Sequence, residues 1–377
     1  MKKVLHVNDS LQAGGAEQVF KDTMTIMEGI TENYSYVSDN KRNIFSYIFS
    51  FKNFIKLLVK LYRIKPDIVH LHNFYHYLSP AILLSIFFYK SFYKLQVIYT
   101  AHDYHLICPN SGMQYYKNNE RINFSNLKKE KFWFYQLDDR GWIISIMKKL
   151  QFFIAYRVLF LHKVIDTIVA PSFFMKNILS VYGIKNKIKV IRNPCSLPVE
   201  KESRVSIPCL DSLNLIFIGR LSKEKGIIEL IIDLERIDFP ITLHVLGDGD
   251  LLEHVQDLAK KSSHTIVMHG YKDKSYIYEL SRKCHAFILP SIWYENAPLS
   301  IIEAAFWGLP IVVRNLGGMK EMAELTEVSY TYNTFEELNY IITVHLRHNL
   351  LINRVRDSIV FSKDFYRAQI KSLYDEY

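Results

Sequence analysis

The stretch that decides the fold is Trp293–Ala304, which reads WYENAPLSIIEA. The apolar run Ala286–Pro290 just before it predicts a buried strand, so the chain passes here from a strand through a loop into a helix. Pro298 fits the first turn of that helix, because a proline there loses no hydrogen bond. A helix N-terminus offers unpaired amide groups and the positive end of the helix dipole. We therefore expect it to bind a phosphate, with Glu295 and Glu303 facing sugar hydroxyls.

Apolar runs alternate with amphipathic stretches along the whole chain. The expected strands are 4–8, 67–73, 96–102, 167–172 and 188–193, then 213–220, 241–247, 265–270, 286–291 and 310–315. The expected helices include 16–28, 225–236, 251–261 and 299–307, and residues 334–377 also read as helical. This alternation predicts an α/β protein built from parallel sheets with helices on both faces.

The chain is long enough for two domains, and residues 193–212 mark the division. This stretch contains three prolines and several charges and lacks any periodicity, as expected of a linker. We expect a first domain over 1–195, a linker over 196–212 and a second domain over 213–355. Residues 356–377 are expected to form a C-terminal helix that packs back on the first domain.

Charge is distributed unevenly between the two halves. The net charge is +9, but residues 1–195 carry 27 Lys and Arg against 13 Asp and Glu, whereas residues 196–377 carry 20 against 25. The basic half is also rich in aromatic residues, which favours an anionic surface as its partner. The sequence contains no zinc-finger spacing, basic zipper or ribonucleoprotein motif, so we expect a membrane surface and no nucleic acid.

Two segments of the basic half combine apolar and cationic residues. Within Phe45–Arg63, the cations at 52, 56, 60 and 63 recur at helical spacing and share one face. Trp142–Lys163 repeats the mixture. One interpretation is two ordinary surface helices that cover a sheet. The other is docking on an anionic bilayer, at about 1 kcal/mol per cation.

The sequence also bears on the cellular compartment. The sequence contains no run of about 18 apolar residues, so we expect no membrane-spanning helix. Met1–Lys3 leads directly into a strand rather than a signal region. The four cysteines are scattered without a CxxC pair, which is typical of thiols in a reducing compartment. We expect a cytoplasmic protein, peripheral on the inner face of the cytoplasmic membrane.

In each half of the chain, a glycine-containing turn follows the first strand. Gly14 and Gly15 would let the backbone approach a phosphate, although a plain strand–helix turn explains them equally. In the turn 219–226, Arg220 can bind phosphate oxygens through two N–H groups and Lys225 adds a point charge. Two such cations can neutralise a departing diphosphate without a metal. The alternative is a solvated basic turn.

His102 ends a buried strand, at the edge where α/β sheets bind their ligands. It can donate or accept a hydrogen bond at a reacting centre, or simply cap the strand. Other histidines are close in sequence, but their spacing matches no standard metal site, so we expect no metal: they are His70, His72, His76 and His105. A turn with a helix N-cap accounts for Asp248–Asp250 better than a metal-binding carboxylate pair does.

Taken in order, these motifs resemble glycosyltransferase family 4, whose GT-B fold has two Rossmann-like domains facing each other across a cleft. The resemblance covers nearly the whole chain and is strongest over 213–324. It rests on Gly14-Gly15, His102-Asp103, Gly219-Arg220 with Lys225-Gly226, Gly247-Asp248-Gly249, and Glu295 with Glu303 after seven intervening residues.

The resemblance implies a role for each residue. Arg220 and Lys225 would bind the donor diphosphate, assisted by the backbone of Asn296, Ala297, Pro298 and Leu299. Glu295 would hold the transferred sugar and Glu303 the ribose, while Gly270 and Tyr271 would frame the base. His102 would lie at the reacting face of the first, acceptor-side domain, and Gly14 and Gly15 would close over the phosphates.

The activity implied is that of a metal-independent hexosyltransferase that retains anomeric configuration and uses no cofactor. It would move a sugar from a nucleotide-sugar donor to a glycan, which a lipid carries in surface polysaccharide synthesis. The segment 103–109 also resembles one common in bacterial polysaccharide members. Two alternatives remain: a nucleotide-sugar 2-epimerase on the same fold, and a non-catalytic membrane-associated scaffold.

Overall fold

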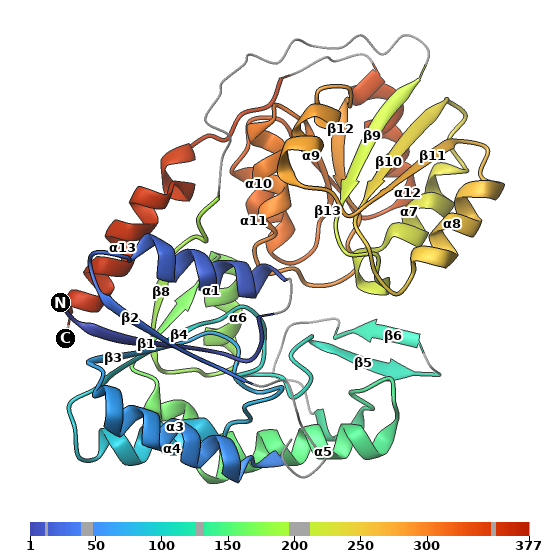
Figure 1. Ribbon diagram of the computed structural model, residues 1–377. Helices are drawn as coiled ribbons and strands as arrows, with labels where there is room; N and C mark the ends of the chain where they lie inside the picture. Colours follow the sequence, from blue (N-terminus) through green and yellow to red (C-terminus); the bar gives the residue numbers. More distant parts are fainter. Residues whose placement is uncertain are drawn as a thin grey trace. The chain divides into compact units, whose positions relative to one another are not determined.

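The computed structural model describes residues 1–11, 14–38, 48–118, 120–124, 132–195, 212–347 and 352–376 (Figure 1). The chain forms two compact units, each with its own six-stranded parallel sheet. One unit combines Met1–Pro194 with Val360–Tyr377, and the other spans Cys195–Ile359. The predicted α/β class with two Rossmann-like sheets is confirmed. Of the expected linker 196–212, all but Ser212 lies outside the described residues.

The first unit has the strand order β2-β1-β3-β4-β7-β8. The strands are β1 (Lys3–Asn8), β2 (Glu32–Val37), β3 (Ile68–Leu71), β4 (Gln96–Thr100), β7 (Thr167–Ala170) and β8 (Lys187–Val190). All but β2 coincide with strands expected from the sequence. β1 and β8 begin one residue earlier than expected and β3 one residue later, while β3, β4, β7 and β8 end two or three residues earlier. β2 lies at the edge of the sheet and none of its residues is buried, so it lacks the apolar signature of the others.

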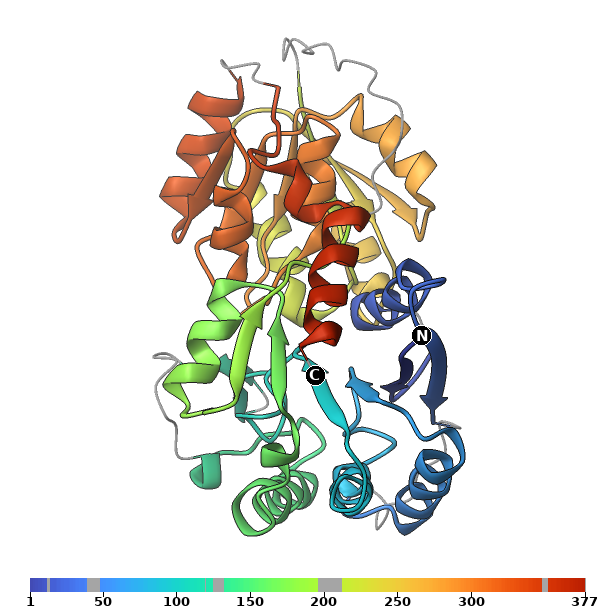
Figure 2. The same ribbon diagram turned by 90° about the vertical axis from the view of Figure 1, so that its left-hand side faces the viewer.

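Helices cover both faces of this sheet. Its helices are α1 (Gly15–Ile26), α3 (Phe51–Ile64), α4 (Ala81–Lys90), α5 (Trp142–Phe153), α6 (Phe173–Val181) and α13 (Lys363–Asp375). A π-helical turn (Ile154–Val158) and a 3₁₀ turn (Leu161–Val164) follow α5, and β5 (Gln114–Lys117) pairs with β6 (Glu120–Asn123) in a hairpin. In Figure 1 and Figure 2, α3, α4 and α5 run along one side of the sheet, while α1 and α13 lie on the other.

The last helix, α13, packs into the core of the first unit. Ile370 and Leu373 are fully buried there with Val4 and Ile98 of the sheet. The Tyr374 hydroxyl is hydrogen bonded to the Nδ1 atom of a buried histidine on β3 at 2.8 Å. These contacts join the end of the chain to the first sheet, although the whole second unit lies between them in the sequence.

The expectation that residues 334–377 are helical throughout is wrong. α12 (Phe335–Tyr340) and a π-helical turn (Ile341–Leu346) begin the stretch, but residues 352–357 are extended or in a turn. Asn353 explains the interruption, because its side chain binds the backbone of Val328 at 2.7 Å and of Leu309 at 2.8 Å. Bonds to loops beside the sheet therefore replace helical hydrogen bonds here.

The second unit has the strand order β11-β10-β9-β12-β13-β14. The strands are β9 (Leu213–Ile218), β10 (Ile241–Leu246), β11 (Thr265–Gly270), β12 (Ala286–Leu289), β13 (Ile311–Arg314) and β14 (Ser329–Tyr332). The helices between them are α7 (Ile227–Leu234), α8 (Leu252–Lys261), α9 (Lys274–Ser281), α10 (Leu299–Phe306) and α11 (Gly318–Glu324). The direction of winding reverses between β9 and β12. Ligands of such sheets bind at this switch point, beyond the carboxyl ends of the strands.

Within the described ranges, no helix combines the length and the apolar character needed to cross a bilayer. Cys108, Cys195 and Cys284 are buried free thiols, and Cys209 lies outside the described residues.

Candidate functional site

Two oppositely charged side chains meet at the switch point of the second sheet. Lys225 follows β9 and Glu295 follows β12, and the Lys225 ammonium lies 2.5 Å from Oε1 of Glu295. The Ser291 hydroxyl donates to the same oxygen at 3.0 Å. Glu295 is 8% exposed. A lysine and a carboxylate expected from separate motifs are thus brought together where a ligand of this fold would bind.

Backbone contacts hold the two loops against each other. The Ile292 amide donates to the Glu224 carbonyl at 3.0 Å, and the Ser291 hydroxyl donates to the same carbonyl at 2.8 Å. Gly226 has a φ of +68°, and a Cβ there would stand 2.3 Å from the Pro290 carbonyl oxygen. Only glycine satisfies both conditions, so it fixes how closely the turn approaches the loop.

A third loop, which was not predicted from the sequence, supports Glu295. Gly317 is the N-cap of α11 and Gly318 is its first residue, and the Gly318 amide donates to the Glu295 carbonyl at 2.6 Å. Gly317 has a φ of +60°, which favours glycine. The paired glycines at the start of a helix were a visible signal, of the same kind as Gly14-Gly15 after the first strand.

Glu303 lies on α10 and pairs with a lysine that was not among the residues predicted from the sequence. The Lys274 ammonium, at the first residue of α9, is 2.6 Å from Oε1 of Glu303. Gly270 ends β11 with a φ of +68°, and Tyr271 after it is 80% exposed. Lys274 follows these two residues closely in the chain. Lys274, at the start of α9, therefore connects the residues expected at the base, Gly270 and Tyr271, with the residue expected at the ribose, Glu303.

The helix expected to bind phosphate at its N-terminus begins at Leu299, in agreement with the expected range 299–307, but Pro298 precedes its first turn. Pro298 is the N-cap of α10 rather than its first residue, and Leu299 is the first helical residue. Asn296 and Ala297 form the loop between Glu295 and this cap. The first-turn amides of α10 thus follow directly on the loop that carries Glu295.

Arg220 is directed toward a different partner. Its guanidinium lies 3.8 Å from the Asp250 carboxylate, and its side chain is 65% exposed. The expected N-cap in Asp248–Asp250 is wrong, because α8 is capped by Leu251 with no side-chain bond, while Asp248 accepts from the Gly249 amide. Arg220 is thereby exposed beside a surface carboxylate at the end of β9.

In the first unit, His102 and Asp103 follow β4. The His102 Nε2 atom is 3.0 Å from Nδ1 of His72, and the Tyr75 hydroxyl donates to Asp103. Burial lowers the pKa of His102 to about 4 and raises the pKa of Asp103 to about 6. At neutral pH, His102 is therefore a neutral hydrogen-bonding group beside an ionised carboxylate.

Gly14 and Gly15 lie at the N-terminus of α1, also in the first unit. Gly14 is the N-cap, with an extended backbone that any residue could adopt. Among the described residues, no atom stands within 4 Å of where a Cβ of Gly15 would be. Neither backbone angle nor crowding therefore requires glycine at Gly15. This leaves room for the close ligand approach expected from the sequence.

Three buried histidines of the first sheet offer nitrogens within 4.8 Å of one another: His6, His70 and His72. Both ring nitrogens of His70 already have partners, Tyr374 and Thr100, each at 2.8 Å. The rings of His70 and His72 stack with centroids 4.6 Å apart, so their in-plane lone pairs do not converge on one point. We interpret this cluster as a polar part of the core rather than a metal centre.

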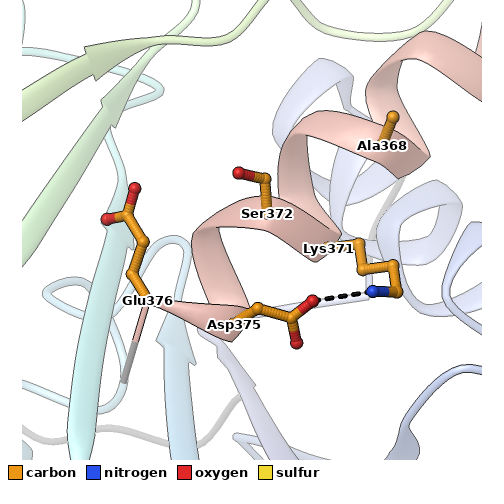
Figure 3. Close-up of a pocket in the computed structure, with 5 residues that line it drawn as sticks. All are labelled: Ala368, Lys371, Ser372, Asp375 and Glu376. Carbon is orange, nitrogen blue, oxygen red and sulfur yellow. Dashed lines mark hydrogen bonds and ion pairs between the residues drawn. The ribbon is translucent and has the colours of Figure 1, made fainter.

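A hollow of about 450 Å³ runs along α13, lined by Ala368, Lys371, Ser372, Asp375 and Glu376 (Figure 3). Its charged side chains pair with protein groups. Lys371 lies 2.7 Å from Asp375, and Glu376 pairs with Lys187 at 2.8 Å and with Lys189. We assign it no ligand.

Comparison with known proteins places this geometry in context. The protein-family model described as "Glycosyltransferase Family 4" matches residues 25–197 of this chain. The family model described as "Glycosyl transferases group 1" matches residues 200–339. An uncharacterized 41.2 kDa protein in the cps region of Klebsiella pneumoniae is 24% identical over 79% of this chain and 73% of its own length. The lipopolysaccharide 1,6-galactosyltransferase of Escherichia coli K12 is 30% identical over 34% of this chain and 36% of its own. The crystal structure of Anabaena HepE with UDP-glucose is similar over the full length of both chains, with a TM-score of 0.67 and 16% identity.

Proposed function

We propose that this chain, which belongs to glycosyltransferase family 4 and has the GT-B fold, transfers a sugar from a nucleotide-diphosphate donor to a glycan with retention of anomeric configuration. The observation that carries the proposal is the Lys225–Glu295 pair at the switch point of the second sheet. It presents a cation for a diphosphate and a carboxylate for sugar hydroxyls within one hydrogen bond of each other. A sugar joined to a diphosphate offers phosphate oxygens to the cation and hydroxyl groups to the carboxylate.

Donor binding would redistribute the charges of this site. The Lys225 ammonium, which pairs with Glu295, would turn toward the incoming phosphates, and Glu295 would accept from sugar hydroxyls instead. Arg220 is exposed and can leave Asp250, since a surface ion pair contributes only about 0–1 kcal/mol. Glu303 would exchange Lys274 for the ribose. Gly270 and Tyr271 would frame the base, and the loop Asn296–Leu299 would add backbone groups to the phosphates.

The chemical step would be a displacement on one face of the sugar. The leaving diphosphate would accept the proton of the acceptor hydroxyl as the new bond forms, so no protein base is required. Arg220 and Lys225 would neutralise the charge that develops on the diphosphate, which is why we propose that the step is independent of metal. His102, neutral at pH 7, would contribute a hydrogen bond at the reacting face, and Gly14 and Gly15 would approach the phosphates.

We propose that the acceptor is a lipid-linked glycan in surface polysaccharide synthesis. The two relatives support this class of acceptor, since one is a protein of a cps region and the other a lipopolysaccharide galactosyltransferase. The first unit, with its excess of positive charge, would bind the acceptor. We further propose that it does so as a peripheral protein on the cytoplasmic face of the membrane.

The helices α3, α4 and α5 support attachment to a membrane. On α3, Phe51, Ile55, Val59 and Tyr62 form an exposed apolar stripe, while Leu57 and Leu61 of the opposite side are buried. Exposed lysines adjoin this stripe at positions 52 and 56. Lys60, expected on the same cationic face, instead donates to the Ser35 carbonyl at 2.6 Å. An ordinary covering helix would expose its polar side, so this apolar stripe favours a bilayer interface.

Exposed apolar residues continue onto the neighbouring helices. Phe87 and Phe88 of α4 are about half exposed, and α5 exposes a stripe at helical spacing that consists of Ile143, Ile146, Leu150 and Phe153. We refer to these residues and the α3 stripe as the α3–α5 face. In Figure 1 and Figure 2 the three helices run along the same side of the first sheet.

The test of the proposed reaction uses purified protein with UDP and UDP-sugars, because UDP-glucose is the ligand in the HepE complex. Calorimetry measures UDP binding, and NMR of the product determines its anomeric configuration. The Lys225→Ala and Arg220→Ala variants should each lose about 2.7–4 kcal/mol of transition-state stabilisation if each cation acts like one oxyanion-hole donor. Lys223→Ala removes an exposed lysine of the same turn and is the matched control.

Equal kcat/KM in the wild type, Lys225→Ala and Lys223→Ala proteins would contradict the proposed donor site. Nucleotide release that does not depend on acceptor, with the sugar changed at C2, would instead indicate an epimerase. An inverted product would refute retention, and loss of activity in EDTA with recovery on adding Mg²⁺ would refute metal independence.

A further inference from the structure

A groove of about 590 Å³ opens on the first unit between α4 and the segment that follows α5. Its walls are apolar: Leu84 and Phe87 of α4 face Leu159, Phe160 and Leu161. This volume lies within the range of about 300–1,000 Å³ typical of small-molecule sites. The groove adjoins the α3–α5 face, because Phe87 belongs to both.

The backbone beside the groove is unusual at two successive places. α5 continues into the π-helical turn Ile154–Val158, a conformation that is rare and frequent at functional sites. Phe160 then has a φ of +50°, in the left-handed region that bulky residues seldom occupy. Its ring is 48% exposed, so full burial does not offset the strain. Strain retained at a half-exposed aromatic residue points to a ligand or partner for that residue.

The charges at the groove favour an anionic ligand. Lys90 lines the groove, but its ammonium lies 2.5 Å from the Asp166 carboxylate, which neutralises it. Lys163 also lines the groove, with its ammonium 4.6 Å from the centre of the Phe160 ring. The apolar walls therefore end at a cation on the same turn as the strained residue. This combination suits an amphiphile with one hydrocarbon chain and a phosphate.

We propose that this groove binds one hydrocarbon chain of an anionic phospholipid, with its phosphate at Lys163. The chain lies between Phe87 and Phe160, and the phosphate replaces the aromatic ring as the partner of the Lys163 ammonium. The inference rests on the proposed membrane attachment for the source of its lipid. The proposed membrane attachment uses the α3–α5 face as a surface, whereas this inference assigns a site for a single lipid molecule.

The test uses lysophosphatidylglycerol below its critical micelle concentration, with the full-length protein and without vesicles or nucleotide. Calorimetry compares Phe87→Ser with Phe88→Ser. Both phenylalanines are exposed on α4, at 50% and 44%, but only Phe87 lines the groove. Phe87→Ser is expected to weaken binding about tenfold, because the chain loses one apolar wall, and Phe88→Ser is expected to bind as the wild type does. Circular dichroism confirms that each variant is folded.

The phosphate contact is tested with Lys163→Gln. In this variant, the ratio of the affinity for lysophosphatidylglycerol to that for lysophosphatidylcholine should fall about fivefold. This is the effect of one cation at an anionic surface. No binding of either lipid to the wild type, or equal weakening by Phe87→Ser and Phe88→Ser, would overturn the proposal. If the groove instead binds a peptide helix or another partner, neither lipid should bind to the wild type.

Separate measurements distinguish this inference from the proposed function. Flotation with anionic vesicles tests attachment, and UDP calorimetry tests the donor site. Vesicle binding without binding of monomeric lipid refutes the groove alone. Binding of monomeric lipid without flotation supports the groove and refutes membrane attachment.

Discussion

Gly318 and Asn296 approach each other so closely that a Cβ on Gly318 would stand 1.7 Å from the Asn296 carbonyl oxygen. The first residue of α11 and the loop before α10 are therefore in backbone contact. This contact lies next to Glu295, whose carbonyl accepts the Gly318 amide. The position of the candidate sugar-binding carboxylate thus depends on a glycine from a neighbouring strand connection.

The Gly318→Ala substitution should push the Asn296 loop away and lower both stability and donor affinity. Overpacking of this kind typically costs about 1–3 kcal/mol. Unfolding of the second unit in urea can be followed by labelling of Cys284, which is buried in that unit. UDP binding is measured by calorimetry on the same variant. Unchanged stability together with unchanged UDP affinity would show that the glycine does not set the position of this loop.

Gly15→Ala is expected to lower kcat/KM without lowering stability. Its Cβ would meet no described atom within 4 Å, and alanine is favoured over glycine in a helix by about 0.5–1 kcal/mol. The variant should therefore be at least as stable as the wild type, as judged by labelling of the buried Cys108 in urea. If the Gly15 backbone approaches the donor phosphates, kcat/KM should nevertheless fall. An unchanged kcat/KM would remove Gly15 from the proposed site.

The pair of Lys225 and Glu295 should behave as an energetically coupled unit. Lys225→Met leaves the Glu295 carboxylate with Ser291, at a cost of about 1–3 kcal/mol for a charge that loses its main partner. Glu295→Gln removes that charge, so the double variant should be more stable than the sum of the two single changes predicts. A double-mutant cycle on Cys284 labelling should give a coupling of about 0.5–3 kcal/mol. A coupling near zero would mean that the ion pair does not form in solution.

The sequence predicts strands that contain an apolar run, including the edge strands β8 and β11, and misses strands whose side chains are mostly polar. Ala286–Leu289 is buried at every residue, so its apolar run alone marks a strand. β2 and β14, with the sequences ENYSYV and SYTY, lie at sheet edges and carry polar side chains. They were missed because pairing with a neighbouring strand, rather than burial of an apolar face, defines them.

The candidate site could be predicted in its charged groups but not in its contacts. Lys225 and Glu295 stand out because each follows a buried strand in a recognisable turn. Their pairing depends on the strand order that places β9 beside β12, which no local pattern contains. Lys274 was missed for the same reason, since its role is defined by Glu303 on another helix. The catalytic roles of His102 and Glu295 remain predictions.

Stability of the first unit should fall below neutral pH because its core histidines are buried in the neutral form. Burial lowers the pKa of His6 to about 4, and it also lowers the pKa values of His70 and His72. Between pH 6.5 and 4 the unfolded chain binds a proton at His6 that the native chain does not, so the unfolding free energy falls by about 1.4 kcal/mol per pH unit for His6, and His70 and His72 act in the same direction. Asp103 opposes this between pH 6 and 3.8, because burial raises its pKa to about 6.

The His6→Gln variant tests the assignment. Glutamine does not titrate, and its amide can still bind Asn33, the 3.2 Å partner of the His6 Nε2 atom. The unfolding free energy between pH 5 and 6, measured by pulse labelling of Cys108 in urea, should depend less steeply on pH by about 1.4 kcal/mol per unit. The same pH dependence in the variant and the wild type would show that His6 is not a buried neutral group.

The last prediction concerns the lysines beside the apolar stripe of α3. Neutralising both in a Lys52→Gln, Lys56→Gln variant should weaken binding to anionic vesicles by about 2 kcal/mol, or roughly thirtyfold, because each cation near the surface contributes about 1 kcal/mol. The matched control is Lys260→Gln, Lys261→Gln, which makes the same change of charge on exposed lysines of α8 in the other unit. Flotation measures both variants at one salt concentration, since screening alters the effect. Equal loss in the two variants would show that net charge, rather than the α3–α5 face, determines attachment.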